Sequence, residues 1–430
     1  MSNSDTTTLK AAVARGIPGR YRREWLFRSS GLLALLIGLS FLAFFFYTLI
    51  GNGYTAFWQT HIELSVALEE RTIDPDGTRA PDVIAQANYQ GMIRDALRAR
   101  FPEISARGEL RQLFALISPG AGFELRERVI ADPSLIGTTL TMDVLADDDV
   151  DMLFKGNTSR DVPESDRRLN DRQIAWIDSL IDTGAIDTHF NSNFFVSGDS
   201  RDPELAGIWS ATVGSFFMLL VTLVLSFPLG VATAIYLEEF APRNRWTDVI
   251  EVNINNLAAV PSIVFGLLGL ALFINLFGLP RSAPLVGGLV LSLMTLPVII
   301  IASRAALTAV PPAIRDAALG VGASKMQMVL HHVLPLAMPG MLTGTIIGMA
   351  RALGESAPLL MIGMVAFIVD VPGSPTDPST ALPVQVYLWA DSPERAFVER
   401  TSAAIIVLLV FLLLMNAAAI VLRKRFEQRY

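Results

Sequence analysis

The hydrophobic positions of the chain fall into six long runs that are separated by polar segments. These runs cover residues 31–50, 208–236, 254–277, 285–307, 341–368 and 403–422. A helix of about 20 apolar residues crosses the hydrocarbon core of a bilayer, and every run reaches that length. The pattern therefore predicts an all-α polytopic membrane protein with six transmembrane helices.

The segment between the first two runs, residues 51–205, has a different composition. It holds 27 acidic and 15 basic residues, a net charge of −12, whereas the whole chain carries −7. Helical patterns occur near 81–101, 109–117 and 171–181, and Asn170 with Gln173 three positions later is typical of a capped helix start. The segment is predicted to be a separate acidic domain outside the bilayer, mainly helical or α+β.

Basic residues flank the outermost runs and predict the orientation. Arg20, Arg22 and Arg23 precede the first run, and Arg423 and Lys424 follow the last. Because cytoplasmic flanks carry the excess of Lys and Arg, both termini are predicted to be cytoplasmic and 51–205 periplasmic, with 1–30 as a cytoplasmic tail. A signal peptide is the alternative for the first run. No small-x-small cleavage pattern follows it, so 31–50 is interpreted as a retained anchor.

The loop 309–340, AVPPAIRDAALGVGASKMQMVLHHVLPLAMPG, predicts two helices joined by a glycine turn. Prolines suit a first helical turn, and Gly322 suits the left-handed position that ends a helix. Ser324 and Gln327 form a capping-box pattern for a second helix, which is expected to end near Pro335. By its residues alone, the first helix either enters a groove on another protein or lies on the membrane surface.

Two charges interrupt the apolar run 341–368. Arg351 and Glu355 are four positions apart and would share one helix face. Ionisable residues within a membrane are costly and face the protein interior or a water-filled cavity. They are interpreted either as a pair that fixes packing or as part of a pathway for an anion.

The loop resembles the EAA motif of binding-protein-dependent ABC importer permeases. The matching residues are Asp316, Ala317, Ala318, Gly322, Leu334 and Pro335, with aspartate in place of the motif glutamate and His332 in place of an aliphatic residue. The stretches FPLGVATAIYLEEFAP, AAVPSIVFGLLGL and GMARALGESAPLL resemble PstA-type subunits of phosphate ABC transporters. Together the resemblance covers about 205–430.

The resemblance implies a type I, MetI-like permease core over 206–430 in a bacterial inner membrane. It implies a dimer of ABC ATPase subunits, a second permease of PstC type and a periplasmic phosphate-binding protein as partners, with phosphate as substrate. Asp316, Ala317, Ala318 and Gly322 would couple to the ATPase, and Arg351 and Glu355 would lie along the translocation pathway.

The remaining chemistry of the sequence narrows the function classes. GVGASK is not a P-loop, so the chain is not expected to be an enzyme, and ATP hydrolysis is assigned to a partner. The sequence contains no cysteine and no HExxH spacing, so no metal site and no cofactor are expected. A nucleic-acid partner is not expected either. The alternatives are a permease for another oxyanion, sulfate or molybdate, and a membrane receptor whose periplasmic domain is a sensor.

Overall fold

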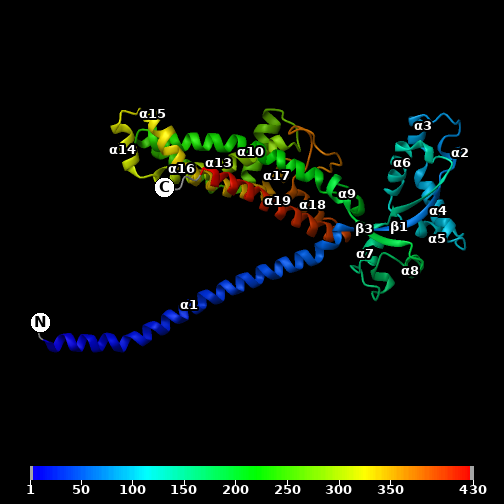
Figure 1. The fold of residues 1–430 in the computed structure, drawn as a ribbon, viewed down its shortest axis with the longest axis horizontal. Helices are drawn as coiled ribbons and strands as arrows, with labels where there is room; N and C mark the ends of the chain where they lie inside the picture. The colour runs from blue at the N-terminus through cyan, green and yellow to red at the C-terminus, as the bar shows by residue number, and fades with distance from the viewer. Residues whose placement is uncertain (1–2, 427–430) are drawn as a thin grey trace. The chain divides into compact units, whose positions relative to one another are not determined.

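The computed structural model describes residues 3–426 and divides the chain into two compact units, residues 1–52 and 53–430. The first unit is almost entirely α1, one helix that runs from Asn3 to Gly53 (Figure 1). Its part from residue 19 onward is long and apolar enough to cross a membrane, and the predicted anchor 31–50 lies inside it. Leu32, Phe41 and Phe44 are exposed on it, which suits a helix that is apolar on all sides and contacts lipid.

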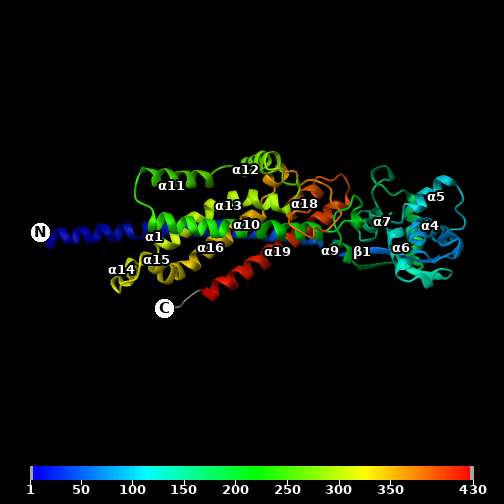
Figure 2. The ribbon, with the colours of Figure 1, turned by 90° about the horizontal axis from the view of Figure 1, so that it is seen from above.

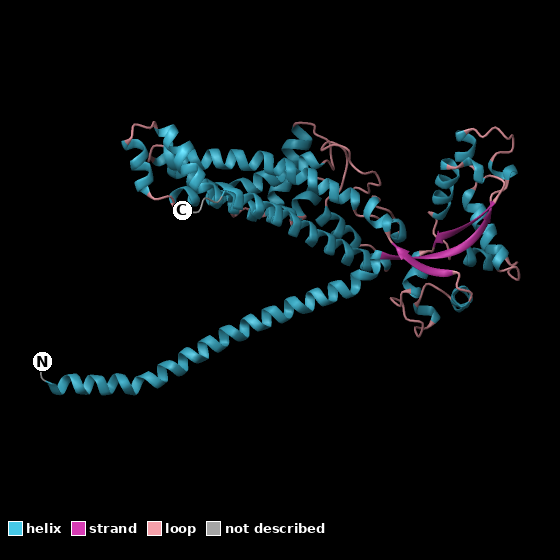
Figure 3. Cartoon of the chain, in the orientation of Figure 1, coloured by secondary structure: helices cyan, strands magenta, loops and turns pink. Residues whose placement is uncertain are grey.

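The second unit begins with a domain that we call the sheet domain, residues 58–190. Three antiparallel strands, drawn in magenta in Figure 3, have the order β2-β1-β3. The strands are β1 (Trp58–Ala67), β2 (Thr139–Leu145) and β3 (Ile186–Phe190), and the helices are α2 (Glu70–Ile73), α3 (Pro81–Gln86), α4 (Tyr89–Arg100), α5 (Arg107–Phe114), α6 (Ala121–Ala131), α7 (Asp148–Phe154) and α8 (Asp171–Asp182). The α+β form of the prediction is thus the one observed.

The core of the sheet domain follows from the alternation along β1. Ile62, Leu64 and Val66 are fully buried on one face, where they pack against the helices. The predicted capping box at Asn170 is present at the start of α8. The helical pattern near 81–101 is two helices, because Asn88 caps a new one: its Oδ1 accepts a hydrogen bond from the Gly91 N–H.

The rest of the second unit is a helical bundle, in which α10, α13, α16 and α19 run side by side (Figures 1 and 2). Its α-helices are α9 (Ser192–Val196), α10 (Trp209–Ile235), α11 (Arg245–Ala258), α12 (Ser262–Gly269), α13 (Pro284–Thr308), α14 (Pro312–Gly320), α15 (Lys325–Met328), α16 (Leu334–Leu353), α17 (Ala357–Met361), α18 (Leu382–Ala390) and α19 (Ala396–Phe426). Three π-helical turns, η5 (Tyr236–Phe240), η6 (Leu270–Leu276) and η7 (Val329–Val333), interrupt them.

Small residues let the bundle helices approach closely. A Cβ built on Gly288 of α13 would lie 2.6 Å from Cβ of Val221 on α10, and one on Gly344 of α16 would overlap the methyl group of Ala302 on α13. Such close backbone contacts are typical of helix packing in membranes, where apolar burial adds little because lipid is equally apolar.

Five helices in the described part of the chain are long and apolar enough to span a membrane, or six if one bent pair is a single span. The predicted run 254–277 belongs to that pair, α11 followed by α12 and η6, which meet at 100°. The bend lies at Pro261, because the residue before a proline is driven out of the helical conformation. The predicted run 254–277 is therefore part of a bent pair rather than one straight helix.

The predicted run 341–368 is wrong in its second half. The spanning helix covers 325–353 instead, and after Gly354 the chain turns into the short helix α17. The Pro358 backbone of α17 packs so closely on α12 that a Cβ on Gly266 would lie 2.7 Å from the proline Cα. Beyond residue 354 the chain turns back instead of continuing the helix, and Leu359, Ile362 and Met364 are buried there, whereas Val365 and Phe367 are exposed.

Two ends of α10 contact different parts of the molecule. At its start the Ile208 N–H donates to the Phe194 carbonyl of α9, 2.8 Å away, next to the sheet domain. At its end the turn η5 packs beside α14. A helix rises about 1.5 Å per residue, so α10 alone separates the sheet domain from α14 by roughly 40 Å.

Candidate functional site

The glycine turn between α14 and α15 has the geometry that the sequence predicts. Pro312 occupies the first position of α14, and Gly322 has φ +90°. The Gly322 N–H donates to the Leu319 carbonyl at 3.0 Å, and the Ala323 N–H donates to the Ala318 carbonyl at 3.1 Å. These two bonds form a Schellman motif, which satisfies the last carbonyls of a helix.

The second helix also starts as predicted, but it does not end where expected. Ser324 and Gln327 form the reciprocal capping box of α15. The helix then widens into η7 and continues through Pro335 into α16, so the expected end near Pro335 is wrong. A wider turn directly before the proline accommodates a ring that would clash with the carbonyl four residues earlier.

The four predicted coupling residues do not share one face. Asp316, Ala317 and Gly322 are exposed, whereas Ala318 is 5% exposed and packs in the chain's own apolar cluster with Met328 and other residues of the following turns. Val321, which is 86% exposed, extends the outward face. The outward face of α14 therefore consists mainly of small side chains and one aspartate. This face is accessible to a partner protein.

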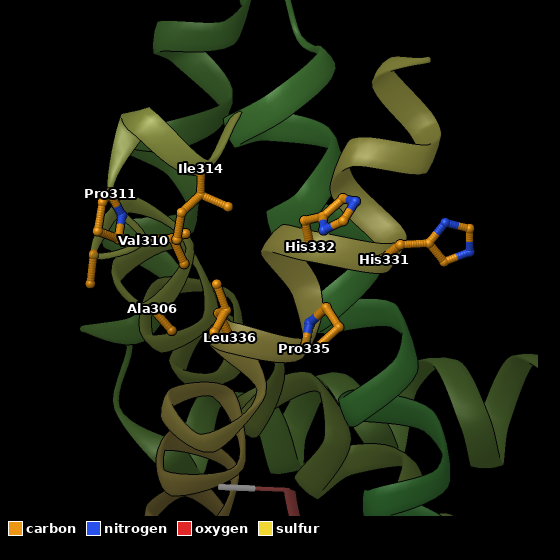
Figure 4. A pocket seen from close by; sticks show the side chains of 9 residues that line it. Ala306, Val310, Pro311, Ile314, His331, His332, Pro335 and Leu336 are labelled. Atoms are coloured by element: carbon orange, nitrogen blue, oxygen red, sulfur yellow. The ribbon is translucent and has the colours of Figure 1, made fainter. Parts of the chain in front are cut away.

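A groove of about 650 Å³ adjoins α14 on the side of η7. It is lined by Ala306, Ala309, Val310, Pro311, Ile314, His331, His332, Pro335 and Leu336. In Figure 4 the His332 side chain lies on the same side of its helical turn as Ile314, and His331 points to the other side. The floor is apolar, and the two exposed imidazoles bring polar atoms to its edge.

Arg351 and Glu355 do form an ion pair, with Arg351 Nε 3.5 Å from Glu355 Oε1. Their place differs from the expectation of a helix centre, because Arg351 lies in the last turn of α16 and Glu355 follows the helix end. The Arg351 side chain is 48% exposed and that of Glu355 is 22% exposed. A cation in the last turn is favoured by the helix dipole, so the pair is less costly there than at a helix centre.

The sequence reasoning missed a buried charge cluster where the sheet domain meets α19. Lys155 Nζ lies 2.6 Å from Asp151 Oδ2 and 3.0 Å from Glu399 Oε1, and all three side chains are under a tenth exposed. Arg400, the next residue of α19, is also buried and donates to the Ala56 carbonyl at 3.3 Å. Lys155 and Glu399 are so far apart in sequence that no local pattern pairs them.

Asp147, Asp148 and Asp149 gather carboxylate oxygens within 4.8 Å of one another. Burial, and then the Asp148 charge, raises the pKa of Asp147 to about 8, and burial with the Asp149 charge raises that of Asp148 to about 6. Asp147 is the N-cap of α7, where its Oδ1 accepts from the Asp149 N–H. Capping and the helix dipole explain acids at this position.

Comparison with known families divides the chain into two matches. Residues 226–430 match "Binding-protein-dependent transport system inner membrane component", and residues 14–164 match "Domain of unknown function (DUF3333)". The second match includes most of α1 and most of the sheet domain.

Individual relatives match between about a third and a half of the chain. The chain is 35% identical to the "Probable ABC transporter permease protein YqgI" of Bacillus subtilis, over 39% of this chain and 56% of that protein. It is 34% identical to the "Phosphate transport system permease protein PstA 1" of Mycobacterium tuberculosis, over 44% of this chain and 62% of that protein. The protein named PstA of Haemophilus influenzae is 27% identical over 51% of this chain and 76% of its own length. The match thus spans less than two thirds of the first two relatives.

Solved structures include one described as inward-facing conformations of the MetNI methionine ABC transporter. The superposition includes 52% of this chain and 95% of the chain in that structure, at 18% sequence identity and a TM-score of 0.41. A bacterial ABC transporter involved in the import of alginate covers 51% and 79%, at 15% identity and a TM-score of 0.39.

Proposed function

We propose that the protein is a permease subunit of an ATP-driven importer for inorganic phosphate, because residues 226–430 match the binding-protein-dependent transport system inner membrane components. The observation that supports phosphate as the substrate is the similarity of the chain to several proteins named as phosphate transport system permeases. Helices α1, α10, α13, α16 and α19, which are long and apolar enough to span a bilayer, would cross the inner membrane, together with the bent pair of α11 and α12.

The exposed face of α14 supports a coupling role. Asp316, Ala317 and Gly322 present a short, rigid helix end that a groove on an ATPase subunit accepts, and Ala318 sets the helix against the chain's own core. The Schellman turn at Gly322 keeps this end from fraying. ATP hydrolysis is assigned to that partner, since the chain has no P-loop sequence.

The other partners follow from the same proposal. A second permease subunit of PstC type completes the pathway, and a periplasmic phosphate-binding protein delivers the anion on the side of the sheet domain. Both termini are then cytoplasmic, in keeping with the basic residues that flank the outer helices.

Arg351 is the residue that we propose to meet the anion. Its guanidinium is half exposed at the end of α16, beside the turn that leads into α17. Non-helical backbone at membrane depth occurs where a chain lines a cavity or is buried in protein. Glu355 holds the guanidinium from one side and leaves donors free for phosphate oxygens, which arginine binds through paired N–H groups.

Another oxyanion, sulfate or molybdate, is the second candidate, because a guanidinium alone does not distinguish tetrahedral anions. The test is uptake of radiolabelled phosphate, sulfate and molybdate by vesicles that contain this chain with its ATPase, second permease and binding protein. Phosphate uptake that requires ATP and disappears without this chain is expected. Uptake of sulfate or molybdate in preference to phosphate would contradict the assignment of the substrate.

A further inference from the structure

Arg315 of α14 joins three separate elements through one guanidinium. Its Nε and Nη2 donate to Glu239 Oε1 at 3.1 and 2.8 Å. Its Nη1 donates to the Val310 carbonyl at 2.7 Å, and Nη2 also donates to the Leu307 carbonyl at 2.9 Å. Leu307 lies in the last turn of α13, Val310 directly follows that helix, and Glu239 lies in η5 at the end of α10.

This ion pair is shielded from solvent. The Glu239 side chain is 6% exposed and that of Arg315 is 19% exposed. The adjacent Glu238 points to a second arginine, Arg304 of α13, whose Nε is 3.5 Å away and whose Nη2 lies 2.9 Å from Glu251 of α11. The two neighbouring acids of η5 thus tie the end of α10 to α13, α11 and α14.

The apolar contacts of α14 are few, which leaves much of its attachment to Arg315. Ala318 is the one residue of this nine-residue helix that is fully buried, and Ile314 is partly buried against the same cluster. Hydrogen bonds weaken steeply when their geometry is disturbed. A shift of α14 by an ångström relative to α10 would therefore disrupt the bonds to Glu239.

We propose that Arg315 is a positioning residue that, through Glu239, locks α14 to the inner ends of α10 and α13, so that a partner ATPase that displaces α14 moves both helices together. The inference rests on the proposed function, because it assigns the partner that displaces α14. The residues that touch the ATPase remain those on the outward face of the helix, and Arg315 acts behind them.

The experiment uses the reconstituted complex with Arg315→Gln, Arg315→Lys, Glu239→Gln and the double variant Arg315→Gln/Glu239→Gln. Arg243→Gln is the matched control, because Arg243 is an exposed arginine just beyond η5. Complex assembly, ATP hydrolysis without binding protein, and the ratio of anion imported to ATP hydrolysed are measured for each. That ratio distinguishes a positioning role from a folding role, because lower amounts of complex leave it unchanged.

We expect Arg315→Gln to assemble and to hydrolyse ATP, while the anion imported per ATP falls about fivefold or more, the lower range of coupling between linked sites. Glu239→Gln should fall in the same direction. The double variant should be no worse than Arg315→Gln, because both changes break one link. Lysine keeps the charge but lacks the planar donors for all three partners, so Arg315→Lys should be intermediate.

A wild-type ratio in Arg315→Gln, or additive losses in the double variant, would overturn the positioning role. Loss of assembly in both Arg315→Gln and Arg315→Lys would also overturn it, since the arginine would then be needed for folding or docking. A wild-type complex that imports none of phosphate, sulfate or molybdate would instead contradict the proposed function. The two failures are therefore distinguishable.

Discussion

Replacing Lys155 with methionine removes a buried cation from the joint between the sheet domain and α19. The ammonium lies 2.6 Å from Asp151 and 3.0 Å from Glu399, and its side chain is 5% exposed. Removing one partner of a buried ion pair costs about 3–5 kcal/mol, because the other charge is left uncompensated. Here two carboxylates would be left in place of one.

The hydrogen bonds that Asp151 and Glu399 keep in the variant limit how much stability the joint loses. Asp151 still accepts from the N–H and hydroxyl of Thr60 at 2.8 and 2.7 Å, and Glu399 still accepts from Asn157 at 2.6 Å. These donors stabilise the stranded charges in part, so the lower end of the range applies, about 3 kcal/mol. At about 1.4 kcal/mol per factor of ten, the joint should open roughly a hundred times more often.

Hydrogen–deuterium exchange of the full chain in detergent measures this opening. Amides around Asp151 and in the first turns of α19 should exchange about a hundredfold faster in Lys155→Met, while amides in the centre of α13 stay protected. The control is Arg128→Gln, which breaks an ion pair to Glu124 whose partners are 46% and 39% exposed. Such surface pairs contribute roughly 0–1 kcal/mol. Exchange in Lys155→Met as slow as in Arg128→Gln would refute the reasoning.

The Gly322→Val variant should assemble but lose most anion uptake. A φ of +90° costs a β-branched residue more than the ~1–2 kcal/mol that an ordinary residue loses in the left-handed conformation. The control Gly320→Ala, at a helical position with open space around the Cβ, should keep wild-type uptake. For Arg351→Gln, Glu355→Gln and their double variant, we expect uptake to fail in the double variant although it assembles and its partner hydrolyses ATP; near wild-type uptake would make Arg351 a packing charge. Burial raises the pKa of Glu204 from 4.5 to about 7, so the folded state holds a proton that the unfolded chain releases. The thermal stability of the folded chain around Glu204 should therefore fall as pH rises from about 4.5 to about 7, and Glu204→Gln should flatten this slope by about one proton in a titration of melting temperature against pH. An unchanged slope in that variant would assign the titration to other groups.

Local features were largely predictable from the sequence, because each depends on residues within one or two helical turns. The start of α14 at Pro312, its end at the left-handed Gly322, and the capping boxes at Ser324 and Asn170 are all present. The hydrophobic runs that became α10 and α13 have nearly the predicted bounds, since a run of apolar residues and its polar flanks specify a spanning helix by themselves, whereas α19 begins seven residues before the predicted run 403–422. The ion pair of Arg351 with Glu355 was also predictable from their proximity in sequence, although Glu355 lies beyond the helix end and not on the expected shared helix face.

Features that depend on packing between helices, such as where a helix ends or bends and which of its sides is buried, could not be predicted from the sequence. The helix end at Gly354 and the bend at Pro261 occur inside apolar runs, where hydropathy does not distinguish a straight span from a segment that turns back against its neighbours. Ala318 matches a motif for partner contact, yet it faces the chain's own core, because the direction of a helix face depends on what packs beneath it.

The sequence by itself determined which segments are apolar, where short helices begin and end, and that an acidic domain is inserted before the bundle. Only the tertiary structure decided which charges distant in the sequence meet. Arg315 and Glu239 are 76 positions apart, and Lys155 and Glu399 are 244 apart. The sequence does not reveal such distant pairs, because their charges come within about 4 Å of each other only after the helices have folded together.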